Sequence, residues 1–80
     1  MSSQPAPNQP RPIRVQASGG EPVRVGAEVV ESIRESWIVE DRWWTGRPIH
    51  RHYWEVVTAG GCNVVVFRDL VRDRWFTQRA

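Results

Sequence analysis

Cysteine and long apolar runs are scarce or missing in this sequence, and each of these two shortages excludes a class of protein. The 80 residues contain one cysteine, so no disulfide can form within the chain. No apolar run approaches the roughly 18 residues of a membrane-spanning helix, and the Pro- and Gln-rich start lacks the apolar stretch of a secretory signal peptide. We therefore expect a soluble, cytoplasmic protein with no membrane contact.

The sequence is rich in large aromatic side chains, which can stabilise a small core without disulfides. A chain this short buries only about 60% of its unfolded surface, so its core needs bulky residues. Five tryptophans are present, and each can bury roughly 150–250 Å². The composition predicts one small domain whose core is built from aromatic rings.

The charges are separated along the chain. The formal net charge is +2, and all eleven basic residues are arginine. Residues 21–41 contain six acids and two arginines, a sum of −4, whereas residues 42–80 contain seven arginines and three acids, a sum of +4. The two arginines of residues 1–20 supply the whole excess. Because residues 21–80 are neutral overall, the sequence does not show the basic domain that is typical of duplex DNA binding.

The first part of the chain differs in composition from the rest. Residues 1–20 contain four of the six prolines together with Ser, Gln and Gly. Such a segment buries too little apolar surface to offset its ordering entropy, so we expect a disordered tail. Residues 12–15 could instead add a short edge strand. Residues 21–80 form the predicted domain.

That domain favours strands throughout. Residues 27–37 fit either a helix or a strand by their apolar spacing, but their β-branched content favours the strand. Val23 and Val25 flank Arg24 with the period of two of a strand, and Gly26 ends that run. Further strands are predicted over residues 49–58, 62–68 and 74–78. The resulting fold class is all-β, a small antiparallel meander of about five strands that forms a curled sheet or barrel.

Two turns connect the last three predicted strands. The first contains the glycine pair at 60–61, which supplies the positive φ of a tight turn. A three-residue loop there would pair Trp54 with Val66, and a two-residue loop would pair Trp54 with Phe67. In the second turn, Asp69 can cap with its side chain and Asp73 tolerates positive φ.

No arrangement of residues indicates catalysis, a metal or a cofactor. His50 and His52 point to the same face of a strand, but the only thiol, Cys62, lies about six residues along the sheet from His52, roughly 20 Å at 3.3 Å per residue. Asp69 near His52 would make two histidines and one carboxylate, which is weak support for a metal site. No Gly-rich phosphate loop opens a helix. We expect a protein that is not an enzyme.

Three adjacent aromatic pairs indicate binding instead. Neighbouring residues of a strand point to opposite faces, so Trp43-Trp44, Tyr53-Trp54 and Trp75-Phe76 must place rings on both faces of the sheet. Rings among arginines suit a protein interface or stacked single-strand bases, and they also suit a second, purely structural core. The candidate binding residues are Trp43, Trp44, Arg47, Arg51, Tyr53, Arg68, Arg74 and Trp75.

Some of these residues also carry a family resemblance. The segments that carry it are Trp37 with the Trp43-Trp44 pair, Tyr53-Trp54-Glu55-Val56, Val66-Phe67-Arg68-Asp69, and Arg74-Trp75-Phe76-Thr77-Gln78-Arg79. Over roughly residues 22–80 the chain resembles a short bacterial domain of unknown function, found alone or near the C-terminus of catalytically inactive, ImuB-type relatives of Y-family polymerases. The resemblance implies an accessory role in translesion synthesis and DNA repair. With that role we expect a polymerase-related or clamp-like protein partner. The rings among arginines leave binding of single-stranded nucleic acid as the alternative.

Overall fold

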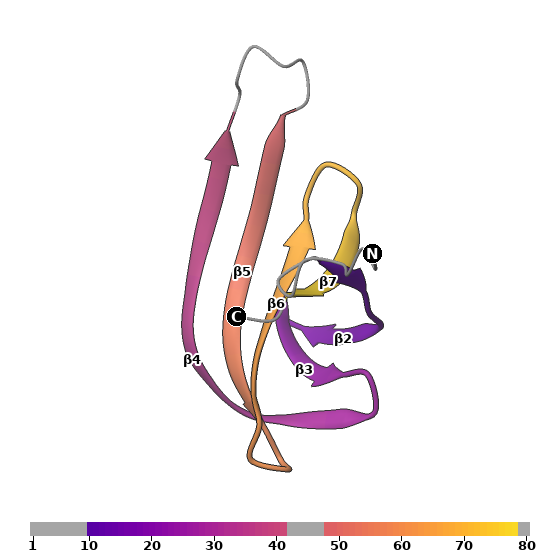
Figure 1. Cartoon of the computed structure of the whole chain (residues 1–80), viewed down its shortest axis with the longest axis vertical. Coiled ribbons are helices and arrows are strands. Elements are labelled where there is room, and N and C mark those ends of the chain that lie inside the picture. The colour runs from indigo at the N-terminus through magenta and orange to yellow at the C-terminus, as the bar shows by residue number, and fades with distance from the viewer. Residues whose placement is uncertain (1–9, 42–47, 79–80) are drawn as a thin grey trace, which may run out of the picture.

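The computed structural model describes residues 10–41 and 48–78, and every regular element in them is a β-strand. The strands are antiparallel and form one curled sheet in the order β1-β7-β6-β5-β4-β3-β2 (Figure 1). Their bounds are β1 Arg11–Pro12, β2 Val15–Ser18, β3 Glu21–Val25, β4 Glu28–Asp41, β5 Ile49–Thr58, β6 Asn63–Asp69 and β7 Arg74–Gln78. The predicted all-β, curled antiparallel fold is confirmed.

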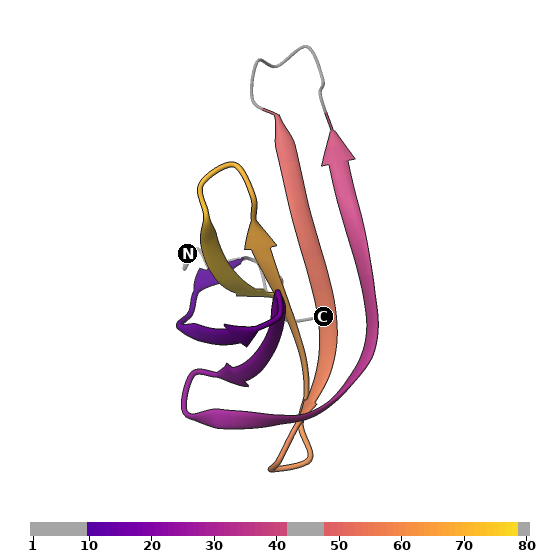
Figure 2. The ribbon, with the colours of Figure 1, turned by 180° about the vertical axis from the view of Figure 1, so that it is seen from behind.

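The sheet has seven strands and not about five, because the segment predicted to be a tail supplies β1 and β2. These two short strands are separated only by Ile13 and Arg14, yet they lie at opposite edges of the sheet. The Ile13 amide donates to the Trp75 carbonyl at 3.1 Å, and the Gly26 amide donates to the Arg14 carbonyl at 2.7 Å. The sheet therefore curls until one short segment joins both of its edges, as both views show (Figures 1 and 2).

The side chains of Ile13 and Val15 explain why this segment is ordered. Both are half-buried and pack against the core. Residues 1–20 were predicted to be disordered because prolines and polar side chains dominate their composition. The burial of Ile13 and Val15 offsets the entropy cost of ordering the segment. Residues 1–9 of the predicted tail lie outside the described residues.

Strand β4 is long and bends. It covers residues 27–37 almost completely, so the choice of strand over helix is confirmed. The register with β5 shifts between Val30 and Ser32 and again between Ile33 and Glu35. Extra residues of this kind bend a strand. The first part of β4 consequently runs beneath β3, and the second part rises beside β5 as an outer strand (Figure 1).

The last three strands follow the sequence closely. Strands β5 and β7 have the predicted bounds, and β6 begins and ends one residue later than predicted. Trp54 pairs with Val66, so the three-residue loop is the one that forms.

The turn between β6 and β7 has the predicted chemistry. The Asp69 carboxylate accepts the amides of Val71 and Arg72, both at 3.0 Å, and Asp73 has φ of 57°.

The core lies on the concave side of the curled sheet. Its buried members come from β3, β5 and β6. The part-buried residues around them come from β2, β4, β6, β7 and the link between β1 and β2. The buried members are Val25, Trp54, Val56 and Val66, and the surrounding residues are Ile13, Val15, Val30, Ile33, Val64 and Trp75. Among the described residues no helix is long and apolar enough to cross a membrane.

Candidate binding surface

The pairing of β5, β6 and β7 separates the aromatic residues into two sets. Directly opposed residues of antiparallel strands share a face. Tyr53 is opposite Phe67, which is opposite Phe76, whereas His52 is opposite Arg68, which is opposite Trp75. The prediction that aromatic pairs would place rings on both faces is confirmed for Tyr53-Trp54 and Trp75-Phe76.

The concave set belongs to the core. Trp54 is buried and is flanked by two rings: His52 stacks on it with a centroid separation of 3.8 Å, and Trp75 lies 5.1 Å away. These three side chains pack together on the core face of the sheet. Their arrangement is explained by packing.

The convex set forms a row that crosses four strands. Trp37 of β4, Tyr53 of β5, Phe67 of β6 and Phe76 of β7 lie side by side, and we call these four residues the aromatic ladder. The centroid separations along the row are 5.4, 4.8 and 5.2 Å. The two end pairs are nearly parallel, with interplanar angles of 4° and 19°, and the central pair is tilted by 37°. Each ring therefore stands beside the next, as cross-strand partners do.

Arg51 contacts the two central rings of the aromatic ladder. The Arg51 guanidinium lies 4.6 Å from the centroid of the Phe67 ring, and its Nη1 donates to the Tyr53 hydroxyl at 3.1 Å. Phe67 is only 1% exposed, although it lies on the convex face, whereas Trp37 at the end of the row is 37% exposed. The convex face thus combines a small second core with an accessible aromatic end.

The structure brings together some of the predicted site residues and separates others. Arg51, Tyr53 and Arg74 share the convex face, since Arg51 is opposite Asp69, which is opposite Arg74. Arg68 and Trp75 lie on the opposite face. The remaining three candidates fall outside the described residues: Trp43, Trp44 and Arg47.

Arg68 has a local role in the turn between β6 and β7. Its Nη2 and Nε both donate to the same oxygen of Asp73, at 2.6 and 3.1 Å. Both side chains are exposed, so this ion pair contributes little to stability.

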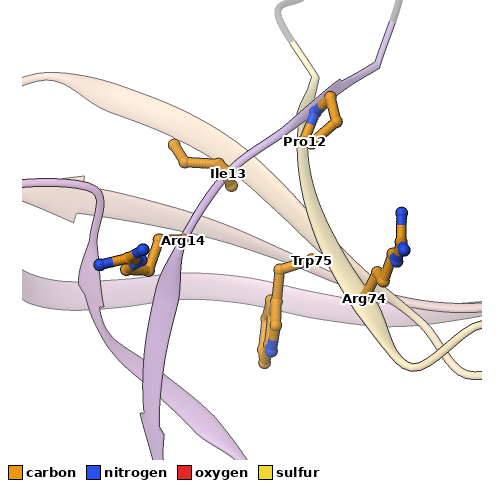
Figure 3. Close-up of a pocket in the computed structure, with 5 residues that line it drawn as sticks. All are labelled: Pro12, Ile13, Arg14, Arg74 and Trp75. Atoms are coloured by element: carbon orange, nitrogen blue, oxygen red, sulfur yellow. The ribbon is translucent and has the colours of Figure 1, made fainter.

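A shallow, open depression lies where the segment between β1 and β2 crosses β7. It is lined by Pro12, Ile13, Arg14, Arg74 and Trp75 (Figure 3). The two arginines lie on opposite sides of Trp75 and do not converge on a common point (Figure 3). The depression therefore offers no paired cations for a phosphate or a carboxylate.

The histidines are accounted for by other contacts. His52 stacks on Trp54, and His50 lies 4.0 Å from a Glu40 oxygen on the neighbouring strand. Asp69 is opposite Arg51, so its side chain lies on the other face from His52. In the described part of the chain no three His, Cys, Asp or Glu side chains gather as metal ligands would.

Three members of the aromatic ladder were not among the predicted site residues. Phe76 shares a face with Tyr53 only when the loop after β5 has three residues, which the sequence left open. The same register places Phe67 in the row. Trp37 joins it through the pairing of β4 with β5, which depends on the loop between those strands and has no local sequence signal.

Comparisons with protein-family models, curated proteins and solved structures found no match to this chain.

Proposed function

We propose that this chain is a non-catalytic binding module that docks on a protein partner through the aromatic ladder and the arginines beside it. The observation that carries the proposal is the row itself: four neighbouring rings on the convex face, outside the main core, held by Arg51 and ending in an accessible Trp37. Aromatic residues and arginine dominate the energetics of protein interfaces. A row that is already assembled loses little side-chain entropy when it is buried.

The stacking favours a protein over single-stranded nucleic acid. Bases bind by stacking on exposed ring faces. Tyr53 has Trp37 on one side and Phe67 on the other, and Phe67 has Tyr53 and Phe76. The inner rings therefore have little free face to offer a base, and the row presents mainly ring edges. Ring edges can pack against the apolar side chains of a protein partner.

The cellular setting is proposed from the resemblance alone. A domain similar to those found with ImuB-type polymerase relatives would act as an accessory factor in translesion synthesis, in the cytoplasm, on a polymerase-related or clamp-like protein. The arginines of the convex face, Arg51 and Arg74, would then pair with carboxylates of that partner.

The test is affinity capture with quantitative mass spectrometry from cells that express the chain. We expect one defined protein to be captured by the unmodified chain and lost with Trp37→Ala. Val23→Ala, which removes an apolar side chain of similar exposure on β3, should retain it. Retained capture by Trp37→Ala, with its fold verified by circular dichroism, would contradict the proposal.

A fluorescence titration with a single-stranded oligonucleotide distinguishes nucleic-acid binding from protein binding. Base stacking on tryptophan quenches its fluorescence, and salt reverses the binding. We expect no quenching when a single-stranded oligonucleotide is added at low salt. Quenching that disappears with Trp37→Ala would favour the alternative.

A further inference from the structure

Among the residues that the structure describes, no strand lies beside the outer edge of β4 over most of its length. Strand β3 pairs only with Glu28 and Val29 of β4, whereas β5 pairs along its other side as far as Asp41. Both views show the second part of β4 as the border of the sheet (Figures 1 and 2). Within the described part of the chain, the regular stretch from Glu35 to Asp41 is an open edge.

The hydrogen-bonding pattern identifies which backbone groups point outward. The His50 carbonyl accepts the Leu70 amide on the β6 side, so the backbone groups of His50 point away from β4. In an antiparallel pair of that kind the opposite residue, Glu40, also directs its N–H and C=O away from its partner. By alternation, the same holds for Ser36 and Ile38. Three residues of the edge thus present donors and acceptors that an added strand could bind.

The side chains along this edge are apolar in the middle and acidic at both ends. Trp37, Ile38 and Val39 are 37%, 59% and 38% exposed. Glu35 lies on one side of them and Glu40 on the other. Glu35 is also directly opposite Glu55 of β5, and neither carboxylate has an ion-pair partner among the residues that the structure describes. Like charges in opposed positions are destabilising, and a cation beside them would relieve the repulsion.

The same charges disfavour a second copy of this chain as the occupant. A two-fold axis through Ile38 would use the whole regular stretch, but it would place Glu35 opposite Asp41 of the other copy twice. Moving the axis to Trp37 removes that repulsion but brings the irregular pairing between Ile33 and Glu35 into the interface. Self-pairing is therefore opposed by charge in one register and by backbone geometry in the other.

We infer that the edge of β4 binds an extended segment of a partner protein as an added strand, and that this segment has apolar residues in its middle and lysine or arginine at its ends. The inference rests on the proposed protein-binding function and names the class of partner. Trp37 belongs to both surfaces, so the added strand would continue the aromatic ladder by one position. Main-chain hydrogen bonds would supply affinity, and the flanking cations would supply selectivity.

The test uses an end-capped synthetic peptide with two lysines on each side of a Val-Thr-Val centre. Binding is followed by amide chemical shifts of the ¹⁵N-labelled chain. We expect shifts concentrated at Ser36, Ile38 and Glu40, and no binding by the same peptide with glutamates in place of its lysines. A peptide methylated on all of its backbone nitrogens has no N–H donor on either edge and should not bind. Equal binding by the methylated peptide would overturn the inference.

Matched substitutions locate the interaction on the chain. Glu35→Gln with Glu40→Gln should weaken peptide binding by about tenfold or more, because two charge pairs are lost. The exposed Glu21→Gln on β3 should leave it unchanged. Two results would contradict the inference: peptide-induced changes in amide chemical shift that lie away from the β4 edge, or a dimer of the free chain joined across Ile38.

The two proposals fail separately. If the peptide binds the β4 edge but Trp37→Ala still captures the partner, the ladder proposal fails and strand addition stands. If capture depends on Trp37 but the peptide does not bind, strand addition fails and the ladder proposal stands.

Discussion

At the scale of single residues, the four rings of the aromatic ladder have different tasks. Phe67 is almost completely buried on the convex face, beneath Arg51 and between Tyr53 and Phe76. Trp37 ends the row and remains accessible. The hypotheses of a second structural core and of a binding surface are thus compatible, since they apply to different members of one row.

Substituting Phe67, the most buried ring, and Trp37, the exposed ring, separates the structural role from the binding role. Phe67→Ala should lower the free energy of unfolding by about 3–5 kcal/mol, the cost of emptying the space of a buried ring, which a domain of this size scarcely tolerates. Trp37→Ala should cost much less, because a third of its surface is already in water. Urea denaturation measures both, and similar losses for the two variants would show that the whole row is structural.

Asp69 provides a second residue-scale prediction. Its buried carboxylate accepts the amides of Val71 and Arg72 and so holds the turn after β6. Asp69→Ala should destabilise the chain by about 1–3 kcal/mol, because two amides lose their acceptor. Asp69→Asn keeps an oxygen acceptor and should lose less. Thermal unfolding checks the order of the three proteins, and equal stability of the alanine variant would contradict this account of the turn.

At the scale of elements, the sequence predicts best where local signals are strong. The β-branched run at 49–58, the glycine pair and the aspartates of the second turn determine β5, β6 and β7 almost to the residue. The pairing of β4 with β5 has no such signal, so Trp37 could not be assigned to the ladder. The short strands β1 and β2 were missed because their order depends on contacts with distant β7 and β3.

Proline substitutions test the alternation of hydrogen bonds along β4. Ile38 directs its N–H outward, so Ile38→Pro removes no bond to β5 and should be tolerated, as proline is on a sheet edge. Val39 directs its N–H toward Arg51 of β5, so Val39→Pro removes a ladder hydrogen bond and should cost about 1–3 kcal/mol. Thermal unfolding compares the two. The reverse order of stability would mean that the register of β4 is shifted by one residue.

At the scale of the whole molecule, a single short segment closes the curled sheet. Strand β1 holds the β7 edge and β2 holds the β3 edge, with Ile13 between them against the core. The charges are divided as well, since β4 contains five acids and one arginine, whereas β5 to β7 contain the arginines of the ladder face. The chain therefore offers an aromatic, cationic face and an acidic edge that meet at Trp37.

The closing segment yields a prediction about the whole fold. Ile13→Asp places a charge against the core and should lower the melting temperature by several degrees or prevent folding, because a charge buried without a partner is costly. Gln16→Asp adds the same charge at an exposed position of β2 and should have little effect. Equal melting temperatures would show that the segment does not support the core.

Site-specific photo-crosslinking at position 37 can show whether a protein partner binds where the aromatic ladder meets the edge of β4. A photoreactive phenylalanine derivative replaces Trp37, the chain is illuminated in cells that express it, and adducts are identified by mass spectrometry, with position 16 as an exposed control. We expect one protein adduct at position 37, attached through an extended segment rich in lysine or arginine, and none at position 16. An adduct to nucleic acid, or no adduct at position 37 beyond that at position 16, would contradict this expectation.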